Sequence, residues 1–200
     1  MQIHEIRKSK IHHQYKLHKG QSINNSDFEQ TETEEGSSKD LTIYKPLLKE
    51  IADTLSTIVS KNKTYNKHKK DNSPFIHKNI PKISLYDYLF RIQKYAEIEN
   101  STIIIALIYI DRICNKKGII LTKYNIHRIL FISILISIKY NEDIIYNNSF
   151  YSKIAGVSVS ELKILEEEFL NTINFELYVP DTLYQKYYNF LNFSDELKLN

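Results

Sequence analysis

The sequence predicts an all-α fold, and three of its features indicate this. Its 200 residues include only four glycines and four prolines, too few for the many tight turns of a β-sandwich or barrel. Hydrophobic residues make up 42% of the chain, which is enough for one buried core at this length. The apolar residues recur at helical spacing, and helix start and stop signals separate the segments in which they do so.

The pattern divides the chain into four regions. Residues 1–41 contain few apolar side chains and an acidic run, so we expect a disordered tail. Residues 42–60 are expected to form a flanking helix, because Pro46 suits a first turn and one apolar stripe follows it. Residues 61–80 form a polar linker rich in lysine and asparagine. Residues 81–192 hold the main helical domain and a short C-terminal helix.

The main domain should contain five short helices. The first carries one apolar face, with Leu85, Leu89 and Ile92 at helical spacing. The second is expected at about 102–114, with Asn100-Ser101 as its N-cap. The third, about 124–140, is apolar almost all round, which is typical of a central helix surrounded by others.

Two signals near the end of this domain define its last two helices. The fourth helix is expected over about 148–155, ending at Gly156. Ser158 and Glu161 have the spacing of a capping box, which predicts the start of a fifth helix that runs to about residue 173.

Charge, cysteine content and motifs exclude several functions. The net charge of +3 and a basic run in the linker do not indicate a nucleic-acid partner, because no reading module accompanies them. Cys114 is the single cysteine, so an internal disulfide framework is excluded and we expect a packed thiol. No apolar run reaches the ~20 residues of a membrane span. We find no nucleotide-binding motif and no convergent titratable residues, so we expect no enzyme activity, cofactor or small-molecule substrate.

Several sequences in the main domain, taken in order, resemble the cyclin family. YLFRIQKY is similar to the first helix of the cyclin box, and ALIYIDRI to the second. ILISIKYNED resembles the end of the third. The long stretch YNNSFYSKIAGVSVSELKILEEEFLNTINFEL, with the entry IPKISLYDYLFRI, resembles the P-type (U-type) branch, known for partners of phosphate-responsive kinases. Ala155 and Lys163 depart from that branch, where glycine and asparagine are usual.

The resemblance implies a single cyclin box of five helices, with the extra N-terminal helix and the short C-terminal helix outside it. It also implies roles for five residues. Arg91 and Asp111 align with a structural ion pair between the first two box helices. Lys139 and Glu166 align with residues that bind the regulatory helix of a kinase, and we expect each to be solvated in the free protein. Leu130 aligns with an apolar position that contacts the kinase.

The function implied is that of a regulatory subunit that binds and activates a cyclin-dependent serine/threonine kinase through a groove between the third and fifth box helices. Such a protein would be intracellular, in the nucleus, the cytoplasm or both. The alternative keeps the fold and changes the partner: a cyclin-box transcription or scaffold protein that binds nucleic acid or polymerase components.

Overall fold

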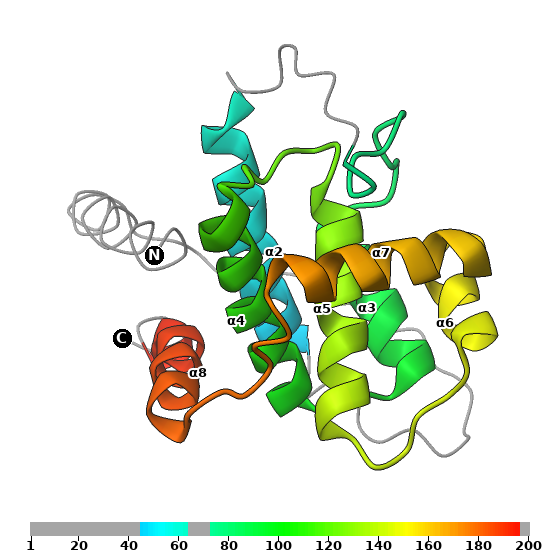
Figure 1. The fold of residues 1–200 in the computed structure, drawn as a ribbon. Helices are drawn as coiled ribbons and strands as arrows, with labels where there is room; N and C mark the ends of the chain where they lie inside the picture. Colours follow the sequence, from blue (N-terminus) through cyan, green and yellow to red (C-terminus); the bar gives the residue numbers. More distant parts are fainter. Residues whose placement is uncertain (1–44, 64–72, 197–200) are drawn as a thin grey trace, which may run out of the picture.

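The chain folds into a bundle of helices, shown in Figure 1. This computed structural model describes residues 45–63 and 73–196, in which there are seven helices and no strand. The all-α prediction is therefore confirmed for that part of the chain. The predicted tail, 1–41, and residues 64–72 of the predicted linker lie outside the described residues.

The helices follow the order in which the sequence predicts them. The flanking helix is α2, and the five helices of the main domain are α3 to α7, with α8 after them. Their bounds are α2 Lys45–Lys61, α3 Leu85–Ala96, α4 Asn100–Lys117, α5 Ile126–Asn141, α6 Asn148–Ala155, α7 Val159–Thr172 and α8 Asp181–Glu196. None of the helices in the described ranges has the length and apolarity that a membrane crossing requires.

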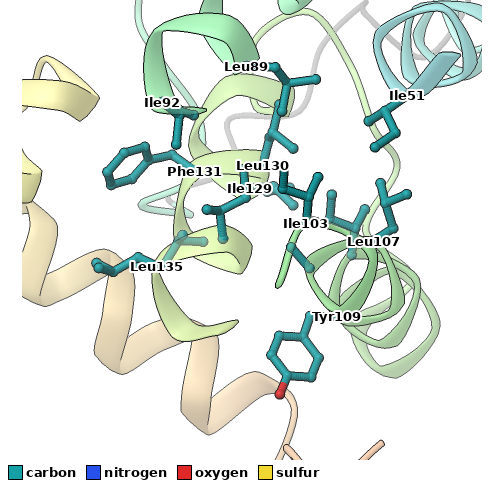
Figure 2. Packing of buried hydrophobic residues seen from close by; sticks show 14 of the residues in the cluster. Ile51, Leu89, Ile92, Ile103, Leu107, Tyr109, Ile129, Leu130, Phe131 and Leu135 are labelled. Atoms are coloured by element: carbon teal, nitrogen blue, oxygen red, sulfur yellow. The ribbon is translucent and has the colours of Figure 1, made fainter. Parts of the chain in front are cut away.

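Helix α5 is the centre of the bundle, as its apolar sequence predicts. It packs against α3, α4, α6 and α7, and α7 crosses over it in Figure 1. Figure 2 shows Ile129 and Leu130 of α5 on the side of Ile103 and Leu107 of α4. Ile126 and all ten residues from Ile129 to Ile138 of α5 are buried. Two of them are serines, and each donates its hydroxyl to a backbone carbonyl. Because almost every face of α5 is buried, burial supplies the stability that a β-branched helix lacks intrinsically.

Local capping chemistry explains where several helices begin and end. Ser84 and Asn147 cap α3 and α6, each accepting a hydrogen bond from a backbone N–H three residues on. Ser158 caps α7 in the same way, through Glu161 N–H at 3.1 Å, as predicted. Gly156 adopts a left-handed conformation with φ of 74° directly after α6, which ends that helix at its predicted position.

One sequence-based expectation needs correction. Asn100 and Ser101 lie inside α4, whose N-cap is Glu99 without a side-chain capping bond. The end of the expected linker also contributes to the core, because Phe75 is buried there. Arg128 of α5 also donates to Pro74 O at 2.5 Å, and His77 N–H donates to Tyr124 O at 2.8 Å. Residues 73–80 are therefore attached to the start of α5.

Candidate protein-interaction site

The C-terminal end of α5 meets the middle of α7, and this contact joins two of the predicted site residues. Lys139 lies in the last turn of α5, and its Nζ donates to Glu166 Oε1 of α7 at 2.5 Å. The two side chains remain 26% and 18% exposed. The expected proximity is present, but the expected solvation is not, because each charge already has the other as its partner.

A third polar residue completes this cluster. Asn148, the first residue of α6, donates from Nδ2 to the second carboxylate oxygen of Glu166 at 3.3 Å. The Glu166 carboxylate therefore has both oxygens engaged and is held in one orientation. A partly exposed carboxylate that is already oriented loses little side-chain entropy when it binds a partner.

Exposed apolar side chains occupy the sequence between Lys139 and Asn148 of this polar cluster. Tyr140 follows Lys139 directly, and Ile144, Ile145 and Tyr146 occupy the loop that leads from α5 to α6. These four residues, named here the α5–α6 patch, are between 46% and 74% exposed. Tyr146 is fixed against Phe150, with ring centroids 4.4 Å apart. Several exposed apolar residues in one short stretch of the chain are typical of a protein-binding surface.

Comparison with known proteins identifies the family. The cyclin family model matches residues 17–177. The chain belongs to the cyclin family. Relatives include Cyclin-U4-2 of Arabidopsis thaliana, 34% identical over 74% of this chain and 67% of its own length, and Cyclin-P3-1 of Oryza sativa subsp. japonica, 33% identical over 72% and 62%. PHO85 cyclin-7 of Saccharomyces cerevisiae is 38% identical over 58% of this chain and 45% of its own length.

The predicted assignment to U-type and P-type cyclins agrees with these relatives. In this cyclin the five predicted box helices are α3 to α7, with α2 and α8 as the extra helices. The matched segments span about half to two thirds of the relatives' own lengths.

Leu130 does not contribute to the surface of this cyclin. It is fully buried, and in Figure 2 it points toward Ile103 of α4. The motif correctly places Leu130 on the third box helix, but α4 and the other helices enclose that helix on this side. Leu130 is a core residue, and a partner could contact it only if the bundle opened.

The predicted ion pair between Arg91 and Asp111 is also not formed. Arg91 Nη2 donates to Lys153 O at 2.8 Å, in the last turn of α6. Asp111 is buried on α4 and accepts a hydrogen bond from the Tyr187 hydroxyl of α8. The physical reason is the packing: α3 lies against α2, α5 and α6, whereas α8 packs on α4. Each charged group therefore finds a partner on a different helix.

Sequence reasoning missed two parts of the site, Asn148 and the α5–α6 patch. The sequence around Asn148 indicates only that a helix begins there, and nothing in it indicates a contact with α7. The patch did have a signal, because Ile144-Ile145-Tyr146 is an apolar run between two helices, where polar residues are usual. Apolar residues in a loop between two helices indicate either core packing or a binding surface. Ile144, Ile145 and Tyr146 are exposed, so the second explanation applies here.

Proposed function

We propose that this cyclin binds and activates a cyclin-dependent serine/threonine kinase through the surface where α5 and α7 meet. The observation that carries the proposal is the oriented Lys139–Glu166 pair at 2.5 Å beside the exposed α5–α6 patch. Membership of the cyclin family supports it, as does the relative named PHO85 cyclin-7. Inside the cell, the complex of this cyclin with its kinase would act in the nucleus, the cytoplasm or both.

The apolar and polar parts of this surface would have different tasks. Apolar contact with Tyr140, Ile144, Ile145 and Tyr146 would supply most of the affinity, because burying exposed apolar area is favourable by about 25 cal/mol per Å². Lys139 and Glu166 would set the orientation of the bound kinase helix. Lys139 has donors to offer a backbone carbonyl at a helix end, and Glu166 has acceptors for N–H groups. Charges at an interface determine specificity more than raw affinity.

Activation would follow from a difference in affinity between two kinase conformations. A kinase is active when its regulatory helix brings a glutamate to the lysine of the third strand and when its activation loop is ordered. A rigid surface that fits only this arrangement of the helix shifts the kinase population toward it. A shift from 1:99 to 99:1 needs about 5.5 kcal/mol of differential affinity. The cyclin contributes no catalytic group in this mechanism.

The proposal can be tested by titrating purified cyclin-dependent kinases with this cyclin and measuring binding and kinase activity together. Glu166→Lys should weaken binding by roughly 2–5 kcal/mol, the cost of disrupting a buried interface charge. Glu167→Lys is the matched control, because Glu167 is the next residue of α7 and is exposed. Equal loss of binding in both variants, or in neither, would contradict the proposed surface.

A further inference from the structure

A small cavity with basic side chains in its wall lies far from the Lys139–Glu166 pair. It has a volume of about 150 Å³ and lies between α3, the first turns of α5 and the turn from α6 to α7. Arg128 of α5 lines it, and Lys139 is eleven residues further along the same helix, which corresponds to roughly 16 Å. The two sites are therefore separate parts of the surface.

Basic groups dominate one side of this cavity. Arg91, Arg128, His77 and His127 line it, and in the part of the chain that the structure describes no carboxylate lines it. Arg128 pairs with Glu161 behind the cavity, so that positive charge is largely balanced. Arg91 pairs with no carboxylate among the described residues and uses one donor on Lys153 O. A guanidinium has five N–H donors, so Arg91 keeps several for another group. The cavity therefore has a net positive charge.

Two buried nitrogens at the cavity have no hydrogen-bond partner among the described residues. They are Arg128 Nε and His127 Nδ1. His127 Nε2 lies 3.0 Å from Ile83 O, so this nitrogen carries the proton and donates to the carbonyl. In the neutral ring, Nδ1 is then an unprotonated acceptor. A buried polar atom without a partner costs about 1–3 kcal/mol. A negative charge in the adjacent cavity would offset part of this cost by favouring a proton on His127 Nδ1.

The other walls of the cavity are apolar, among them Phe131, Val157 and Leu165. The volume is below the range of about 300–1,000 Å³ typical of sites for whole small molecules. A group the size of one side chain fits better. Apolar walls beside a basic rim suit a side chain with an apolar stem and an anionic end, whereas a free inorganic anion would gain nothing from them.

We propose that this cavity binds the anionic side chain, carboxylate or phosphoryl, of a peptide segment in a partner protein. The anionic group contacts Arg91 close to the His127 ring, and its stem lies against the apolar walls. Charge-assisted hydrogen bonds of this kind are about twice as strong as neutral ones. The site is independent of kinase binding at α5 and α7.

Binding at this site should take up a proton. Desolvation lowers the pKa of His127 in the free protein, and nearby His77 lowers it further, while the bond to Ile83 O opposes this. Desolvation and Arg128 likewise lower the pKa of His77, against the opposing charge of Glu161. The other groups that face the cavity are Arg91 and Tyr88. A bound anion favours imidazolium, so it raises both pKa values, and affinity should rise as pH falls.

The test is fluorescence anisotropy with the full chain alone and three labelled peptides that carry Leu-Glu-Leu, Leu-phosphoserine-Leu or Leu-Gln-Leu at the centre. We expect both anionic peptides to bind at least about tenfold more tightly than the glutamine peptide. Arg91→Gln should abolish that preference. Lys94→Gln is the matched control, because Lys94 is an exposed charge on the same helix that does not line the cavity.

Melting curves of Arg91→Gln would show whether the variant is folded. His127→Asn provides a second variant whose binding should depend less steeply on pH, because His77 alone then remains to take up a proton at the cavity. Equal binding of all three peptides, or an unchanged preference in Arg91→Gln, would overturn the proposal. Inorganic phosphate that binds as tightly as the phosphoserine peptide would overturn its peptide part. Because no kinase is present, these outcomes are distinct from a failure of the kinase surface.

Discussion

Exchanging the two charges of the Lys139–Glu166 pair separates its role in folding from its role in binding. Lys139→Glu and Glu166→Lys each place two like charges where the 2.5 Å contact now lies. The double variant restores an opposite pair with reversed polarity. If the pair serves only the fold, the double variant should recover both stability and binding. If the pair orients a kinase helix, stability should recover while binding does not.

The size of the stability effect follows from the separation and the exposure of the pair. Coulomb's law at 2.5 Å gives about 1.7 kcal/mol at the dielectric constant of water and about 7 kcal/mol at an effective value of 20. Measured exposed pairs contribute only ~0.2–1 kcal/mol, because lost solvation and side-chain entropy offset the attraction. With side chains 26% and 18% exposed, we expect each single reversal to cost about 1–2 kcal/mol.

The assay is a thermal melt of each variant beside a calorimetric titration with the cognate kinase. A cost of 1 kcal/mol should lower Tm by about 2–4 °C in a chain of this size. The double variant should return to within about 1 °C of the parent Tm and still bind at least about thirtyfold more weakly, a cost near 2 kcal/mol. Full recovery of binding in the double variant would refute the reasoning, since the pair would then act only within the fold.

Two further predictions concern the buried thiol of Cys114 and the turn at Gly156. Burial, reinforced by the charge of Asp111, raises the pKa of Cys114 to about 12, so a thiol reagent near neutral pH should label it only after urea unfolds the protein. Labelling of the native protein at the unfolded rate would contradict this. Gly156→Ala should cost about 1–2 kcal/mol in urea denaturation, because φ is 74° while the added Cβ meets no atom within 4 Å. A cost near zero would show that the turn relaxes freely.

The sequence predicted the ends of the helices better than the tertiary partners of individual side chains. Helix α6 ends and helix α7 begins where the sequence predicts, because Gly156 and Ser158 act locally, within one turn of the chain. Glu161 shows the limit of such local reasoning. Its N–H bonds to Ser158, as a capping box requires, but its carboxylate pairs with Arg128 of α5, which is distant in sequence. A motif determines what is near along the chain and leaves tertiary partners open.

The candidate site shows the same limit. The resemblance to cyclins assigns Lys139 and Glu166 to one kinase-binding surface, and the two side chains are in direct contact. It placed Leu130 at the correct point along α5 but on a face that α4 covers. A helix that is apolar all round has no polar stripe to mark its exposed side, so the sequence of α5 cannot show which positions face outward. The α5–α6 patch depends on which loop stays uncovered, and that is decided by the packing of several helices together.

The contact between Asp111 and Tyr187 gives a final prediction, because it replaces an ion pair that the family resemblance implies. A double-mutant cycle compares Asp111→Asn with Tyr187→Phe and, separately, with Arg91→Gln. Hydrogen bonds to charged groups contribute about 1.5–3 kcal/mol, so we expect a coupling of at least ~1 kcal/mol between Asp111 and Tyr187. Arg91 bonds instead to Lys153 O, so its effect should add to that of Asp111→Asn within about 0.5 kcal/mol. Urea denaturation of the singles and doubles measures both values. If Arg91 couples to Asp111 more strongly than Tyr187 does, α8 is not what holds Asp111, and the ion pair between α3 and α4 must form in solution.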